Sequence, residues 1–171
     1  FFMRVKICGI RTEEELSVAI KSGADAVGFL VGQIHASTDF ILPSTAARLS
    51  AQMPPYVTPV VVTHLSDADS IMDIITKTGI GTIQIHGSVS DKDIKKIRDF
   101  LPHTGKIILA SYLVETLPDL SSYYQFINAV LLDCYNREPG FIGNDTVAKV
   151  YSWDLAAQFV SHCPLPVILA G

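Results

Sequence analysis

Two side chains that follow apolar runs could exchange protons with a substrate. Cys8 lies between Ile7 and Gly9, and Asp133 ends the run 128–132. A thiol near a positive charge can act as a base or a nucleophile, and an ionisable group at the end of an apolar strand is costly to bury without a purpose. One base and one acid on opposite sides of a cavity would serve an isomerisation by proton transfer. Structural roles stay open, because most free cysteines are small buried hydrophobes.

Two histidines follow other apolar runs and offer a different chemistry. With Cys8 and Asp133, His64 and His86 could bind a metal ion. The histidines lie on separate runs and form neither an HxH nor an HExxH motif. We therefore favour hydrogen-bonded histidines over metal ligands.

These side chains must be positioned by a series of short strands. The β-branched runs lack the alternation of a sheet with one exposed face, which is typical of parallel strands buried on both faces. Strands are predicted at 5–8, 26–31, 57–63, 82–85, 106–110, 126–133 and 167–170. Amphipathic helices are predicted between them at 12–22, 43–52, 67–78, 91–101, 113–123 and 152–162.

Local signals support several of the helix starts. Thr12 with Glu15 forms a capping-box pattern, and Ser66 and Ser90 are candidate N-caps. Pro43 suits the first turn of a helix, where its missing N–H is not needed.

The strict alternation of strands and helices indicates an α/β fold of one domain, residues 1–171. An open doubly wound sheet and a (βα)8 barrel of the TIM type both fit this order, and consecutive units without a GxGxxG motif favour the barrel. In such a barrel the active site lies at the carboxyl ends of the strands. Cys8, His64, His86 and Asp133 should therefore converge there.

The amino-acid composition limits the kinds of partner that the chain can bind. The chain has 171 residues, 49% of them hydrophobic and 18% charged, with a net charge of −4. This favours a compact globular domain and gives no basic field for nucleic acid. No apolar run is long enough for a membrane span, and the start does not resemble a signal peptide. Three cysteines without a CxxC motif suit a reducing compartment, so we expect the cytoplasm.

Five blocks, in order along nearly the whole chain, resemble the motifs of the phosphoribosylanthranilate isomerase family. They are 6–10 (KICGI), 23–29 (GADAVGF), 83–87 (IQIHG), 131–133 (LLD) and 166–171 (PVILAG). The resemblance implies a (βα)8 barrel that catalyses an Amadori rearrangement of a phosphorylated aminosugar in tryptophan biosynthesis. It also implies that Cys8 is the general base and Asp133 the general acid, without metal or cofactor. A small phosphorylated sugar is then the expected partner, and a homo-oligomer is compatible with the resemblance.

Other matches and departures concern substrate binding. His64, His86 and Lys149 are candidate substrate-binding residues, and Gly143 and Gly171 are candidates for binding phosphate.

An acid, Asp39, stands where the family usually has an arginine for the substrate carboxylate. Arg11 is the candidate replacement cation. The segment 145–153 lacks the family's glycines, which let backbone N–H groups approach phosphate. These departures leave one alternative open, a catalytically impaired barrel that binds a phosphometabolite or a protein.

Length adds one more expectation. A complete barrel of this type needs at least about 200 residues, and the seventh predicted strand ends at residue 170. We therefore expect an incomplete barrel with seven strands and six helices, favour a fragment over closure by a partner chain, and expect little turnover from these residues alone.

Overall fold

The chain folds into one curled sheet of parallel strands. The computed structural model describes residues 3–34, 37–113, 117–133 and 153–170. Within them the sheet has seven strands, ordered along the chain, and each neighbouring pair is parallel. They are β1 (Lys6–Cys8), β2 (Ala26–Leu30), β3 (Thr58–Thr63), β4 (Thr82–Ile85), β5 (Lys106–Tyr112), β6 (Ala129–Asp133) and β7 (Val167–Ala170).

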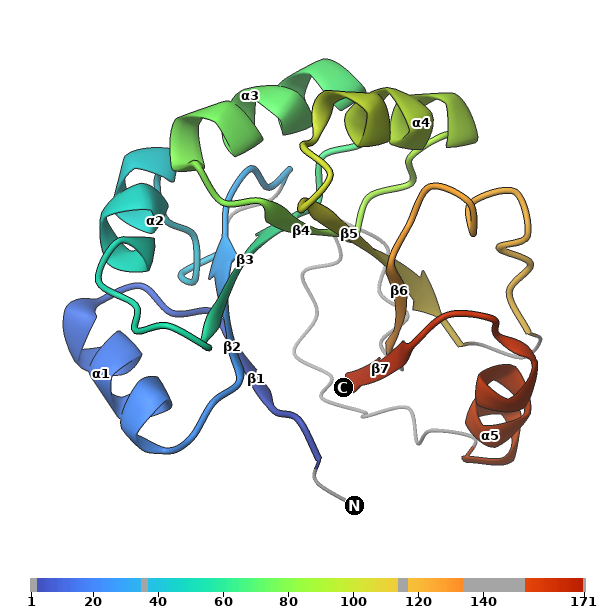
Figure 1. Ribbon diagram of the computed structural model, residues 1–171, viewed down its shortest axis with the longest axis horizontal. Helices are drawn as coiled ribbons and strands as arrows, with labels where there is room; N and C mark the ends of the chain where they lie inside the picture. The colour runs from blue at the N-terminus through green and yellow to red at the C-terminus, as the bar shows by residue number, and fades with distance from the viewer. Residues whose placement is uncertain (1–2, 35–36, 114–116, 134–152, 171) are drawn as a thin grey trace.

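Helices cover the convex side of this sheet (Figure 1). The described helices are α1 (Glu13–Lys21), α2 (Pro43–Ser50), α3 (Ala68–Thr78), α4 (Asp91–Phe100) and α5 (Trp153–His162). In the described part of the chain β1 and β7 each pair on one side only, so the sheet curls without closing. The predicted α/β class and the incomplete barrel are confirmed.

The predicted caps hold with one correction. The side chain of Thr12 accepts a hydrogen bond from the N–H of Glu15, and Pro43 begins α2. Ser90 caps α4 as predicted. The prediction of Ser66 as an N-cap was wrong, because the carboxylate of Asp67 accepts from the Ser70 N–H and α3 begins one residue later.

The predicted helix at 113–123 is not found among the described residues of that segment. Strand β5 continues to Tyr112, and the Leu113 N–H donates to the Asp133 carbonyl. Residues 114–116 lie outside the described part, and residues 121–126 form turns. Pro118 disfavours a helix because it lacks an N–H, and the Asp119 carboxylate instead caps a turn at Ser121.

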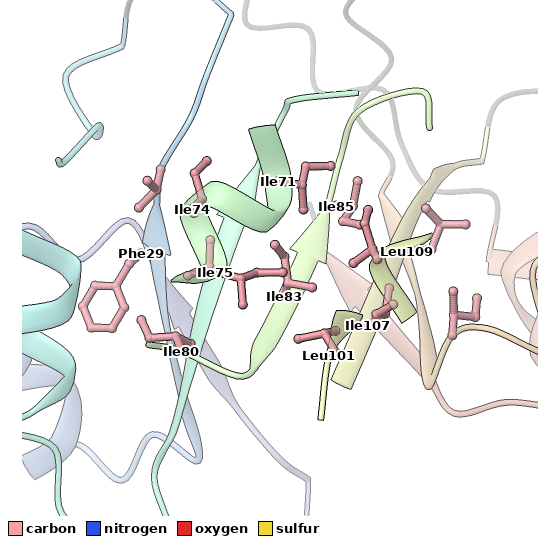
Figure 2. Packing of buried hydrophobic residues seen from close by; sticks show 14 of the residues in the cluster. Phe29, Ile71, Ile74, Ile75, Ile80, Ile83, Ile85, Leu101, Ile107 and Leu109 are labelled. Atoms are coloured by element: carbon pink, nitrogen blue, oxygen red, sulfur yellow. The ribbon is translucent and has the colours of Figure 1, made fainter. Parts of the chain in front are cut away.

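Two apolar clusters lie on the two faces of the sheet. The larger one packs the outward side chains of the strands against the helices, as Ile83, Ile85 and Ile107 pack with Ile71 and Ile75 (Figure 2). The smaller one lines the concave face and contains Val60, Val62, Ile108, Ala129 and Leu131. Each fully buried aliphatic side chain contributes about 1.5–3 kcal/mol to folding. Because successive side chains of a strand point to opposite faces, the membership of these two clusters shows which strand residues face inward.

None of the helices described here has the length and apolarity to cross a membrane.

Candidate active site

Strand β1 presents two chemical groups on the concave face. Val27 and Phe29 of β2 belong to the outer cluster, whereas Ala26 and Leu30 pack against the inner one, so Gly28 faces inward. Cys8 pairs with Gly28 in the sheet register. The sulfur of Cys8 therefore projects over the inner face at the carboxyl end of β1.

Gly28 marks the point where two side chains of β1 converge. A Cβ atom on Gly28 would lie 2.6 Å from Cys8 Sγ and 3.3 Å from Lys6 Nζ. Because both distances start from one point, the sulfur and the ammonium nitrogen are at most about 6 Å apart. Cys8 is exposed and Lys6 half-buried, so the sulfur is accessible beside a cation.

Asp133 ends β6 with a tyrosine beside it. In β6, Val130 and Leu132 point to the outer cluster and Leu131 to the inner one, so Asp133 continues the inward positions. Its register partner on β5 is Tyr112, also at an inward position. Burial, and then the Asp133 carboxylate, raise the pKa of the Tyr112 phenol, which keeps it protonated. Strands β1 and β6 lie on opposite sides of the curled sheet, which places Cys8 and Asp133 on facing walls (Figure 1).

His64 and His86 lie together where β3 and β4 end. Their ring centroids are 5.2 Å apart with the rings nearly perpendicular. Gln84, buried on the inner face, forms a hydrogen bond through its side-chain amide with Nε2 of His86.

His86 stays neutral near pH 7. Burial, and then the charges on His64 and Lys6, together lower the pKa of His86 from 6.5 to about 4. A neutral imidazole can orient a substrate hydroxyl by hydrogen bonding but adds no charge. The ammonium of Lys6 lies on the same inner face, since its Nζ would be 3.3 Å from a Cβ atom on the inward-facing Gly28.

Arg11 and Asp39 sit at the rim next to Cys8. Asp39 Cβ lies 3.9 Å from the position that a Cβ on Gly9 would take, so this carboxylate flanks the end of β1. Arg11 pairs with Glu15 at 2.7 Å and with Asp39 at 3.9 Å. The hydrogen bond that Arg11 donates to Glu15, and then the charge of Glu15, raise the pKa of Arg11. The guanidinium predicted to meet a substrate carboxylate is therefore already engaged by two acids.

Three candidate residues, Lys149, Gly143 and Gly171, lie outside the described residues. Within the described ranges, no three His, Cys, Asp or Glu side chains gather closely enough to hold a metal ion.

Sequence reasoning did not single out Lys6, Gly28 or Tyr112 as functional. Lys6 stands two positions before Cys8, and a period of two places both on one face of a strand. Gly28 and Tyr112 emerge only from the register, which pairs them with Cys8 and Asp133.

Comparison with known proteins points to one family. Residues 5–171 match the model of N-(5'-phosphoribosyl)anthranilate isomerase. The chain is 33% identical to N-(5'-phosphoribosyl)anthranilate isomerase 2 of Methanosarcina mazei, over 99% of this chain and 74% of that protein.

Solved structures give the same answer. The fold resembles phosphoribosyl anthranilate isomerase of Thermus thermophilus, with a TM-score of 0.77, 26% identity, and coverage of 99% of this chain and 76% of that one. It also resembles an isomerase in complex with reduced 1-(o-carboxyphenylamino)-1-deoxyribulose 5-phosphate, with a TM-score of 0.71, 25% identity, and coverage of 98% and 75%. These similarities do not favour the alternative of a non-catalytic barrel.

Proposed function

The chain belongs to the N-(5'-phosphoribosyl)anthranilate isomerase family, and we propose that it converts N-(5'-phosphoribosyl)anthranilate into 1-(o-carboxyphenylamino)-1-deoxyribulose 5-phosphate. This Amadori rearrangement is a step of tryptophan biosynthesis. The observation that carries the proposal is the pair of ionisable groups on facing walls, Cys8 at the end of β1 and Asp133 at the end of β6.

We propose that Asp133 is the general acid and Cys8 the general base. Asp133 donates a proton to the furanose ring oxygen while the bond from that oxygen to C1′ breaks, and the nitrogen lone pair forms a C1′–N double bond, which gives the iminium. Cys8 Sγ takes the proton from C2′, and the electron pair of the broken C2′–H bond moves to give the enolamine. Protonation at C1′ and loss of the hydroxyl proton at C2′ complete the ketone, so the reaction consumes no net proton.

Other side chains are proposed to bind the substrate. The neutral ring of His86 and the neighbouring His64 would orient sugar hydroxyls, since both stand at strand ends near the inner face. Lys149, Gly143 and Gly171 remain proposed contacts to the anionic substrate. Asp39 weakens an approach of the substrate carboxylate at the β1 rim unless Arg11 turns from Glu15 toward it.

The substrate, the cytoplasm as the site of action, and self-association of the chain are parts of the same proposal. The ligand held by one solved relative, a reduced carboxyphenylamino deoxyribulose phosphate, supports a phosphorylated aminosugar as the substrate.

Growth without tryptophan tests the proposed roles. In a strain that lacks this isomerase, the native gene should restore growth, and Cys8→Ala and Asp133→Asn should not. Cys163→Ser is the matched control, because Cys163 is a free, half-buried cysteine outside the inner face. Growth supported by both active-site variants at equal protein levels would refute the assigned roles.

A further inference from the structure

Lys6 is a half-buried cation that no acid neutralises in the described part of the chain. It lies on the inner face, and its Nζ is at most about 6 Å from Cys8 Sγ. The described ion pairs involve other cations, namely Arg11, Arg48, Lys77, Lys95 and Lys96. A structural salt bridge therefore does not explain its place among the described residues.

Among the described side chains next to the Lys6 ammonium, Cys8 is the one whose anion it would attract. Strand β2 faces it with Gly28, which has no ionisable side chain. The residue that follows β4 is His86, which is neutral near pH 7 because its pKa is about 4. On β1 itself the inward neighbour is Cys8. The loop after β2 brings the Asp39 carboxylate to the end of β1 beside Gly9, where Arg11 lies 3.9 Å from it and offsets its charge. An anion on Cys8 would thus meet the positive charge of Lys6 at short range.

We propose that Lys6 is a positioning residue for the base, and that its ammonium attracts Cys8 Sγ and favours the form of the sulfur that accepts the C2′ proton. This inference rests on the proposed function and adds a residue to it. Two opposite unit charges 6 Å apart attract even in water strongly enough to change an equilibrium by about threefold, and more strongly where water is partly excluded.

Alkylation of Cys8 tests this without any substrate. Only the thiolate reacts with iodoacetamide, an uncharged reagent, so the rate reports the anionic fraction. The rate is followed by mass spectrometry of the peptide that contains Cys8, from pH 6 to pH 10, in native protein and in Lys6→Met and Lys6→Gln. Lys6→Arg preserves the charge. Lys106→Met is the matched control, since Lys106 also begins a strand and its loss changes the net charge equally.

At pH 7 we expect Lys6→Met and Lys6→Gln to slow alkylation by about threefold or more. The rates should converge with the native rate at high pH, and Lys6→Arg and Lys106→Met should behave like native protein. A native rate at pH 7 in both neutral variants would overturn the proposal. Slowing by one factor at every pH would also overturn it, because that result indicates altered access to the sulfur.

Steady-state kinetics then separate this role from direct binding of the substrate. We expect Lys6→Met to lower kcat by a similar factor with KM unchanged. A raised KM with unchanged kcat would mean that Lys6 binds an anionic group of the substrate, and the proposal would be wrong. If the native protein shows no turnover, the proposed function fails, and the alkylation result still decides the role of Lys6.

Discussion

At the scale of single residues, the position of the Cys8 sulfur on the inner face depends on the absence of a side chain at Gly28. Cys8 Sγ would lie 2.6 Å from a Cβ atom there, much closer than a van der Waals contact. The sulfur ends a short side chain that can rotate, so a methyl group would displace the reacting atom more readily than the backbone. Gly28 therefore sets the position of the base.

Gly28→Ala should accordingly damage activity more than folding. We expect kcat to fall about tenfold or more, because a displaced base loses its alignment with the substrate, with little change in the midpoint of thermal unfolding. Gly81→Ala is the control, since its nearest neighbour would be 3.9 Å away. Unchanged kcat in Gly28→Ala would show that the sulfur does not need this space.

His86 should make the protein sensitive to mild acid. Its folded pKa is about 4, against 6.5 for an ordinary histidine, chiefly because it is buried. Between these values the unfolded chain binds a proton that the folded chain does not, so stability falls as pH drops from 6.5 towards 4. The contribution at stake is about 3 kcal/mol.

Urea unfolding at pH 7 and pH 4.5 measures this effect. His86→Gln should reduce the loss of unfolding free energy between the two pH values, whereas His103→Gln, at an exposed site, should not. An equal acid-linked loss in His86→Gln and native protein would contradict the assignment to His86.

The positions of Cys8 and Asp133 could be predicted because each ends an apolar run, and parallel strands bring their carboxyl ends to one rim. The groups that surround these two residues could not be predicted from the sequence. The engagement of Arg11 by Glu15 and Asp39 depends on how the loop after β2 folds back to Gly9, which no local pattern specifies.

At the scale of elements, Asn128 joins two strands and a helix. Its side-chain oxygen accepts from the Ile107 N–H at 2.9 Å and from Arg98 Nη1 at 3.3 Å. The Asn128 N–H donates to the Ile107 carbonyl. One amide thus ties the start of β5, the chain entering β6 and the last turn of α4, and so helps to place Asp133.

Asn128→Ala should destabilise the protein by about 1–3 kcal/mol, because it leaves the half-buried N–H of Ile107 without its acceptor. The free energy of unfolding in urea checks this value. Gln125→Ala, an exposed change in the preceding turn, should cost little. Equal stability of the two variants would show that water replaces the Asn128 amide without loss.

The strands were more predictable than the segment between β5 and β6. Runs such as 82–85 and 167–170 are apolar and β-branched, and their predicted bounds match β4 and β7. In 113–123 the apolar spacing suggested a helix, but Pro118 and the Asp119 turn outweigh it. Strand β6 starts at Ala129, later than predicted, since Asn128 uses its side chain to hold β5.

At the scale of the whole molecule, the open sheet creates a gradient of protection. Central strands have two hydrogen-bonded neighbours, whereas β1 and β7 each have one within the described residues. The edge strands also expose apolar side chains, including Ile7 and Leu169. The repeat of a strand followed by a helix predicted both the order of the strands and the curvature of the sheet, so this architecture could be predicted from the sequence.

Hydrogen–deuterium exchange should display the gradient. We expect backbone amides of β4 to exchange at least about tenfold more slowly than those of β1 and β7, because edge strands open without disturbing the core. Mass spectrometry of peptides from each strand measures the rates. Equal protection of β1, β7 and β4 in dilute protein would mean that both edges are covered in solution.

The most direct test of the account is the reaction itself, followed by ¹³C NMR with N-(5'-phosphoribosyl)anthranilate labelled at C2′ of the ribose. We predict that the native protein produces the ketone signal of the deoxyribulose product, contrary to the low turnover expected from chain length alone, and that Cys8→Ala and Asp133→Asn produce it at least about 100-fold more slowly. A native protein that binds the labelled substrate without forming the ketone, or variants that match its rate, would contradict the central claim that Cys8 and Asp133 drive this isomerisation.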